Sequence, residues 1–408
     1  MNLIPIDVDS IQVGRRLPFS LRSSQGILLA QKGFLVESKA YLISMVGSGV
    51  ELFVDVTESD AQRRAYVGKL YELVQEDKPL GQIAVMNLTS NDLALNQAVG
   101  DDTPDWLDIQ VQANAILRDH NPEHFTARLD RLQAQVNRYA KRNPDGTLFA
   151  LIHLSCTELT LYSATHALLV GVMCSLAARE VLNWSPELEA TLCKAALSMN
   201  IGMMDLQDRL AAQPEAPTGA QRQQIDQHVA ASLNQLRQLG VTDVTWLDAV
   251  RGHHSRGPGT LASMTPGQRM ARLIRRADTF AARLAPRATR SPNSPAAAMQ
   301  AIYFDEDRQI DEAGAALIKA VGVYQPGSFV RLTNNEIAVV VRRGANTTTP
   351  RVAVLVNREG MPTGEHVTRD TSLREYRIVA SVPHRDVKIQ INLERFMPLT
   401  SGANDRPW

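Results

Sequence analysis

The sequence has little cysteine and no net charge, and each shortage excludes a class of protein. Its three cysteines, Cys156, Cys174 and Cys193, lie in apolar segments and form no CxxC pair. We therefore expect small buried side chains in a reducing compartment, rather than disulfides or a cysteine-bound zinc ion. Lysine and arginine number 43, as do aspartate and glutamate, so the formal net charge is zero. This balance argues against a protein that binds a nucleic acid polymer through a general basic surface.

Long apolar runs are missing as well. No stretch approaches the length needed to cross a membrane, and the first residues, MNLIPIDVDS, have neither the basic start nor the apolar centre of an export signal. We expect a cytoplasmic protein with no membrane segment. At 408 residues the chain exceeds the usual size of one hydrophobic core, which predicts more than one domain.

The spacing of apolar residues changes along the chain, from alternation to helical periodicity and back to alternation. This change predicts, in order, a small β-rich N-terminal module, a helical linker region, a helical domain, a β-rich C-terminal extension and a disordered tail, over residues 1–56, 57–146, 147–322, 323–399 and 400–408. Within the extension, we expect strands that include Arg377–Val382 and Val387–Leu393. The predicted fold class is mainly α, a helical bundle with a β-rich module at each end.

Four predicted helices of the central domain carry histidine or aspartate residues that could bind a metal ion. They span Leu161–Leu182, Ala220–Leu239, Thr245–His254 and Pro266–Leu284. A further helix begins after Ser185, which can cap it, with Pro186 in its first turn.

Four histidines and one aspartate fall on these helices where a metal site would place them: His166, His228, the doublet His253 and His254, and Asp278. Adjacent residues on a helix diverge by about 100 degrees, so a site that uses both members of the doublet must lie in a crease between helices. Helical bundles build metal sites in this way. Taken singly, the residues have plainer interpretations: a core histidine, a surface helix histidine, a solvated loop pair and an ion-paired surface acid.

Between the first two histidines lies the segment ALSMNIGMMDL, in which Met199 and Asn200 stand side by side. The order of histidines, Met199-Asn200 segment and aspartate resembles the ligand order of the HD-GYP family, with this pair in place of a His-Asp pair. The segments from Arg276 to Phe280 and from Tyr324 to Leu332 are similar to that family too. The resemblance covers about residues 147–345 and, more weakly, residues 1–56.

The resemblance implies a helical, metal-dependent phosphodiesterase domain that cleaves the bacterial second messenger cyclic di-GMP. Several expected residues are replaced, however: the His-Asp pair by Met199 and Asn200, a lysine by Met203, and glutamates by Tyr162 and Ser255. Methionine is a poor ligand for a hard ion, and asparagine brings an oxygen without a charge. The losses imply impaired hydrolysis.

What remains of the ligand set implies a reduced metal site. His228, His253 and His254 could hold one divalent ion, iron or manganese, while His166 and Asp278 are too few for a tight second site. We therefore expect one ion at most, or none.

Three arginines, Arg272, Arg275 and Arg276, follow one another on the helix that carries Asp278. One interpretation is a patch that binds the phosphates of a cyclic dinucleotide, since arginine binds phosphate through two hydrogen bonds. The other is a solvated helix face.

Three functions remain open from the sequence. The chain could be a bacterial signalling protein that has lost hydrolysis and binds cyclic di-GMP or a protein partner. It could be an active metal-dependent phosphodiesterase with a reduced metal site, or a purely structural interaction module. A homodimer is compatible with each of the three.

Overall fold

The computed structural model describes residues 3–6, 11, 17, 19–26, 28–31, 34, 36, 51–55, 104–157, 161–256, 259–285, 295–364 and 367–401. The chain divides into two compact units, Met1–Asp108 with Asn392–Arg395, and Ile109–Ile391 with Phe396–Trp408. The predicted disordered tail, apart from Thr400 and Ser401, and residues 57–103 of the predicted linker region lie outside the described residues.

The described N-terminal residues form a small antiparallel sheet with the strand order β1-β4-β2-β3. Its strands are β1 (Leu3–Ile6), β2 (Leu21–Arg22), β3 (Leu28–Ala30) and β4 (Leu52–Asp55). Phe19, Leu21 and Val54 are fully buried in a hydrophobic cluster that supports this sheet. The β-rich character predicted for the start of the chain is therefore confirmed.

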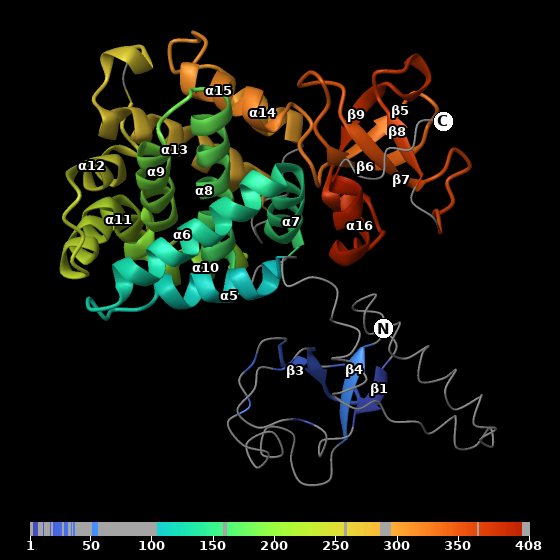
Figure 1. The fold of residues 1–408 in the computed structure, drawn as a ribbon, viewed down its shortest axis with the longest axis horizontal. Helices are drawn as coiled ribbons and strands as arrows, with labels where there is room; N and C mark the ends of the chain where they lie inside the picture. Colours follow the sequence, from blue (N-terminus) through green and yellow to red (C-terminus); the bar gives the residue numbers. More distant parts are fainter. Residues whose placement is uncertain are drawn as a thin grey trace. The chain divides into compact units, whose positions relative to one another are not determined.

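A bundle of helices makes up most of the second unit (Figure 1). Its helices are α5 (Trp106–Leu117), α6 (Phe125–Arg142), α7 (Pro144–Thr157), α8 (Tyr162–Glu180), α9 (Pro186–Ser198), η2 (Ile201–Met203), α10 (Met204–Ala212), α11 (Gly219–Gln238), α12 (Val244–Gly252), η3 (Leu261–Ser263), α13 (Pro266–Leu284), α14 (Pro295–Tyr303) and α15 (Glu312–Val321). Helix α8 is buried from Tyr162 to Ala178 and packs against α7, α9, α13 and α15. A helix that is apolar on every side belongs at the centre of a bundle.

Local signals in the sequence mark several helix ends correctly. The Ser185 side chain accepts a hydrogen bond from the Leu188 backbone N–H, and Pro186 opens α9, as predicted. Helix α13 also begins and ends where its periodicity predicts, behind a capping box formed by Thr265 and Gln268. Helix α12, by contrast, ends at Gly252, so the histidine doublet follows the helix instead of lying within it.

A five-stranded antiparallel sheet with the order β8-β7-β6-β5-β9 forms the C-terminal part of the second unit. Its strands are β5 (Phe329–Leu332), β6 (Ile337–Arg342), β7 (Arg351–Val356), β8 (Thr368–Asp370) and β9 (Ile378–Val382), and helix α16 (Leu393–Thr400) follows. The mainly α fold with a β-rich C-terminal extension is thus confirmed.

The strand predicted over Val387–Leu393 is wrong. Residues 387–392 have no regular secondary structure, and Leu393 is the first residue of α16. The side chains of residues 387–391 nevertheless alternate between half-buried and exposed. Alternation of apolar and polar residues indicates that one side of the segment is buried. An extended segment can show this pattern without pairing to a neighbouring strand.

The C-terminal sheet is joined to the helices at α7. Gly327 has a φ of +89°, and a Cβ atom built on it would lie 3.0 Å from the carbonyl oxygen of Phe149 in α7. Arg343, just after β6, forms ion pairs with Asp145 of α7 and Glu180 of α8 at 2.6 and 2.8 Å. Close backbone approach and a shared ion pair therefore hold sheet and helices together.

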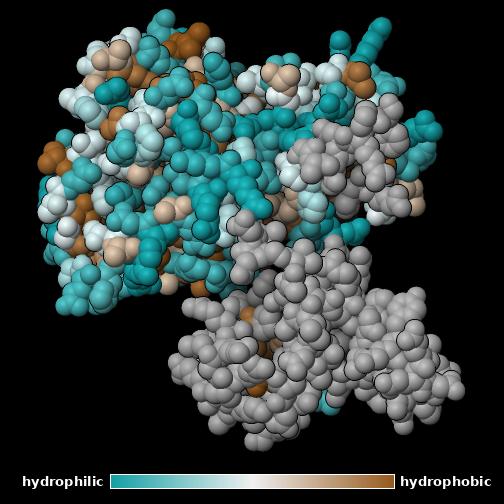
Figure 2. Space-filling view, in the orientation of Figure 1, coloured by the Kyte–Doolittle hydropathy of each residue, from teal (hydrophilic) through white to brown (hydrophobic). Residues whose placement is uncertain are grey.

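Hydrophobic residues on the visible face of the helical body are scattered among hydrophilic ones (Figure 2). Scattered apolar side chains are normal on a protein surface and indicate no particular partner. Among the described helices, none combines the length and the apolar composition needed to span a bilayer.

The substitution Gly327→Ala tests the contact between sheet and helices. We expect the free energy of unfolding to fall by about 2 to 4 kcal/mol, because the new methyl group meets the Phe149 carbonyl in a backbone conformation that alanine avoids. Gly360, with a φ of +82° and open space around it, is the matched control. Gly360→Ala should cost only the conformational part, about 1 to 2 kcal/mol. Equal losses in urea unfolding would contradict the close contact.

Candidate metal centre

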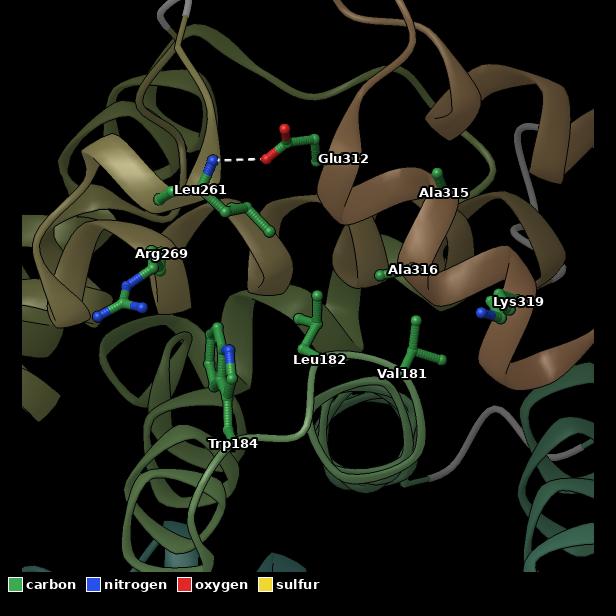
Figure 3. Close-up of a pocket in the computed structure, with 10 residues that line it drawn as sticks. Val181, Leu182, Trp184, Leu261, Arg269, Glu312, Ala315, Ala316 and Lys319 are labelled. Carbon is green, nitrogen blue, oxygen red and sulfur yellow. Dashed lines mark hydrogen bonds between the residues drawn. The ribbon is translucent and has the colours of Figure 1, made fainter.

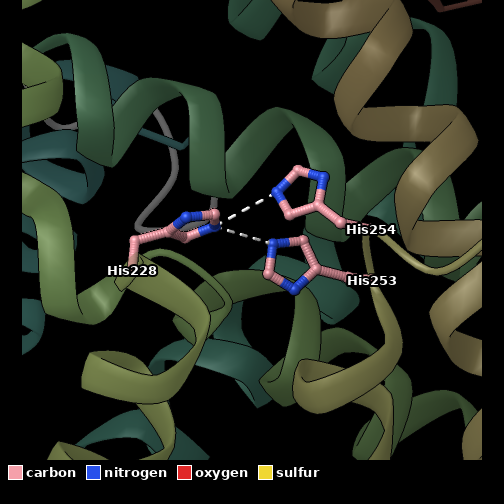
Figure 4. A group of neighbouring side chains, drawn as sticks. All are labelled: His228, His253 and His254. Carbon is pink, nitrogen blue, oxygen red and sulfur yellow. Dashed lines mark hydrogen bonds between the residues drawn. The ribbon is translucent and has the colours of Figure 1, made fainter. Parts of the chain in front are cut away.

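Three of the predicted ligands, His228, His253 and His254, lie together where α11 and α12 meet (Figure 4). The Nε2 atom of His228 lies 3.2 Å from Nε2 of His253 and 3.1 Å from Nε2 of His254. His228 is 5% exposed and His253 is fully buried, whereas His254 lies at the surface. The surface interpretations of His228 and His253 are therefore wrong.

Backbone carbonyls orient the two buried rings. The Nδ1 atom of His228 lies 2.5 Å from the carbonyl oxygen of Ile225, and Nδ1 of His253 lies 2.7 Å from that of Val250. A carbonyl oxygen can only accept, so each Nδ1 must carry the proton. In a neutral ring the opposite nitrogen, Nε2, then has a free lone pair, and this is the arrangement seen in histidines that bind metals.

The donor set fits a metal ion. Two nitrogen ligands held about 2.1 Å from one ion, at about 90 to 110 degrees, lie about 3.0 to 3.4 Å apart. The separations from His228 Nε2 to the other two rings fall in this range. Two lone pairs that face each other at 3.2 Å, on His228 and His253, also repel unless a positive charge lies between them. No other cluster of metal-ligand type occurs in the described part of the chain.

The surroundings of His253 and His254 favour the neutral form of both rings. Burial lowers the pKa of His253 to about 4, and the neighbouring His254 acts in the same direction, although the hydrogen bond to Val250 opposes the shift. Burial also lowers the pKa of His254, while the carboxylate of Asp278 acts against the change. A neutral imidazole is the form that ligates a metal ion.

The segment that resembles a degraded His-Asp pair lies beside the helix of His228. Met199 is 1% exposed. The Oδ1 atom of Asn200 is enclosed and has no hydrogen-bond partner among the described residues. Gly202 brings η2 against α11, because its N–H donates to Ser232 Oγ at 3.0 Å and a Cβ atom would lie 2.5 Å from the Ser232 nitrogen. The glycine of this motif thus permits a backbone contact that a larger residue would prevent.

The other two predicted ligands satisfy each other. His166 of α8 is 3% exposed, and its Nε2 lies 2.7 Å from Oδ1 of Asp278 on α13. Burial opposes the charged form of Asp278, but the hydrogen bond and charge of His166, with contributions from His253 and His254, lower its pKa. The ring of Tyr162 stacks on His166 at a centroid distance of 5.8 Å. This pair therefore serves as a polar bridge between α8 and α13.

Two of the three predicted phosphate-binding arginines are bound to a buried carboxylate. Arg272 and Arg276 reach Oδ2 of Asp311 at 2.6 and 2.8 Å, and Asp311 is fully buried. Oδ1 of the same carboxylate caps α15 through the Gly314 N–H at 2.8 Å. The interpretation as a solvated helix face is wrong for these two arginines. Their role toward a ligand stays a prediction.

Arg275 contacts the backbone just after the histidine doublet. It forms an ion pair with Glu306, and its Nη1 donates to the carbonyl oxygen of Ser255 at 3.4 Å. Its charge contributes to the lowered pKa of His254. Of the three arginines, this one acts electrostatically on a histidine of the cluster, and its role toward a ligand stays a prediction.

Sequence reasoning missed Asp311 and the two carbonyl groups that orient the histidines. Ile225 and Val250 each precede their histidine by one helical turn, and this spacing could have indicated the tautomer. Asp311 carried a weaker signal, because a capping aspartate before α15 is visible in the sequence but its two arginine partners come from another helix.

Fold and site together define a mainly helical protein with a three-histidine cluster of metal-ligand geometry. No family model and no curated protein matches the chain. A solved structure to which it is similar is Bd1817, a HDG"Y"P protein from Bdellovibrio bacteriovorus. The two share 15% identity with a TM-score of 0.42, over 78% of this chain and 98% of that chain.

Replacing Asp311 with asparagine removes the charge that pairs with Arg272 and Arg276 and keeps a residue that can cap α15. We expect the free energy of unfolding at about pH 7 to fall by about 3 to 5 kcal/mol, because two buried guanidinium groups lose their carboxylate. Urea denaturation of both proteins measures the difference.

The same variant gives a pH signature. Burial opposes ionisation of Asp311, but hydrogen bonds from Arg276 and the Gly314 N–H, with the charge of Arg276, lower its pKa in the folded state. Its stabilisation is complete above the unfolded pKa, about 3.9, and is lost as the pH falls through the folded value. The difference between wild type and Asp311→Asn should therefore shrink below about pH 4. A difference that is constant between about pH 7 and pH 3 would refute this account.

Proposed function

We propose that this chain is a bacterial signalling protein of the HD-GYP type that has lost hydrolysis and acts by binding. The observation that carries the proposal is the convergence of His228, His253 and His254, in the order along the chain at which that family has metal ligands. The ligand bound at this centre is cyclic di-GMP or a protein partner, as the resemblance implies.

The ligands present favour a single divalent ion, iron or manganese. Three imidazole nitrogens are the protein ligands that a one-ion site requires. The two residues that would serve a second ion, His166 and Asp278, are hydrogen-bonded to each other at 2.7 Å. When bound, one ion supplies a positive charge that can hold a phosphate oxygen.

Loss of hydrolysis follows from the residues at positions 199 and 200. Met199 is buried and offers no ligand to a hard ion, and Asn200 carries no charge to bridge two ions. Hydrolysis by two metal ions requires a water fixed between them. A site with one ion can still hold an anionic ligand, and Arg275 beside His254 supplies a second positive charge.

Metal content and hydrolysis, measured on one sample, test the proposal. Full-length protein is stripped with chelator and reloaded anaerobically with iron or manganese. We expect about one ion per chain by elemental analysis, and cyclic di-GMP that stays intact by chromatography. The substitution His253→Ala should abolish the bound ion, whereas His384→Ala, a half-buried histidine that hydrogen-bonds the Gly327 carbonyl, should retain it.

The possible results separate the alternatives. Linear dinucleotide or GMP that depends on His253 would overturn the proposal and make the chain an active phosphodiesterase with a reduced site. No bound ion, together with no binding of cyclic di-GMP in calorimetry, would favour an interaction module and end the case for a ligand at this centre.

The double substitution Met199→His with Asn200→Asp restores the pair that the resemblance implies. We expect metal content to rise from about one toward two ions per chain, and slow hydrolysis of cyclic di-GMP to appear. Single substitutions should give neither effect, because a second ion requires both groups. A folded double variant that gains no ion would contradict the assignment of these positions to the metal centre.

A further inference from the structure

A cavity lies at the C-terminal end of α8, whereas His166 lies near the start of this helix. It has a volume of about 540 Å³, and its apolar surface comes from Val181, Leu182, Trp184 and Leu261 (Figure 3). Arg269 and Lys319 line it on opposite sides in that view. Cavities of about 300 to 1,000 Å³ with mostly apolar walls and a few polar groups are typical of small-molecule sites.

Arg269 is the most informative residue of this cavity. Its Nε atom is enclosed and has no hydrogen-bond partner within the described ranges. Its guanidinium group lies over the ring of Trp184, with Cζ 5.9 Å from the ring centroid. A buried donor that stays unpaired is costly. No carboxylate among the described residues pairs with this guanidinium group, so an anion in the cavity would balance its charge.

The other charged groups of the cavity leave room for an anion. Glu312 is engaged, because its Oε2 accepts a hydrogen bond from the Leu261 backbone N–H at 2.6 Å. Lys319 is exposed and pairs with no carboxylate of the described residues. The cavity thus presents two cations and one carboxylate that is already hydrogen-bonded to the backbone.

The cavity is separate from the histidine cluster. Val181 caps the C-terminal end of α8, about 22 Å along the helix axis from His166 at 1.5 Å per residue. Arg269 lies in the first turns of α13, and Asp278 lies more than two turns further along it. None of the residues that line the cavity belongs to the proposed metal centre of His228, His253 and His254.

We propose that this cavity binds a small amphipathic anion, an apolar or aromatic carboxylate whose body lies against Trp184 and Leu182 and whose charge pairs with Arg269. The apolar walls bind the body through burial of hydrophobic surface. The guanidinium group selects a carboxylate over a neutral amide, because a hydrogen bond between two charged groups is stronger than one to a neutral acceptor. This inference is independent of the proposed function.

Isothermal titration calorimetry with 2-naphthoate and 2-naphthamide, which share a shape and differ by one charge, tests the proposal on the full-length protein. We expect naphthoate to bind at least about tenfold more tightly than the amide. Arg269→Gln should remove this preference, and Arg269→Lys should restore part of it. Trp184→Leu should weaken both ligands to a similar extent, because it removes the aromatic wall and leaves the cation.

Two control variants make the result specific. Arg251→Gln removes an exposed arginine of α12 and should leave the preference intact. His253→Ala should do the same, so that failure of the metal centre and failure of this cavity give different results. Equal binding of the two ligands, no binding of either at millimolar concentration, or a preference that survives in Arg269→Gln would each overturn the proposal.

Discussion

In each of the two buried histidines, His228 and His253, the Nδ1–H group donates a hydrogen bond to the backbone carbonyl oxygen one helical turn earlier. These two hydrogen bonds decide which nitrogen faces the neighbouring ring. Because Nδ1 carries the proton in both rings, their Nε2 atoms face each other with lone pairs at 3.2 Å. This arrangement is favourable only around a positive charge. The chemistry of the centre depends on this constraint, because a ring that turned over would present a donor and could not bind a metal ion.

The helices around the histidine cluster are held together by polar contacts between α8, α13 and α15 as well as by apolar packing. His166 and Asp278 connect α8 to α13, and Asp311 connects the start of α15 to two arginines of α13. Buried charged pairs add little net stability over apolar packing, but they are costly to break singly. They therefore favour one relative position of these helices, and α12, which precedes the doublet, packs on α13.

Much of the secondary structure followed from local signals. Ser185 with Pro186 marked a helix start correctly, because capping depends on residues adjacent in sequence. The strand expected at Val387–Leu393 failed because strand pairing depends on a neighbour that the alternation does not reveal. The boundaries expected for the linker region and the central domain stay predictions.

At the candidate site too, local sequence signals were informative, whereas contacts between distant segments were not predictable. The sequence by itself determined that histidines and an aspartate occur in a particular order, that Met199 and Asn200 replace a pair of ligands, and that the chain is mainly helical with alternating segments at its ends. Only the tertiary structure decided that three histidines converge while His166 and Asp278 pair with each other, and that Asp311 binds Arg272 and Arg276. The physical reason is that a residue's partner across a helix interface is set by how ridges and grooves of distant segments pack, and no local spacing encodes that packing.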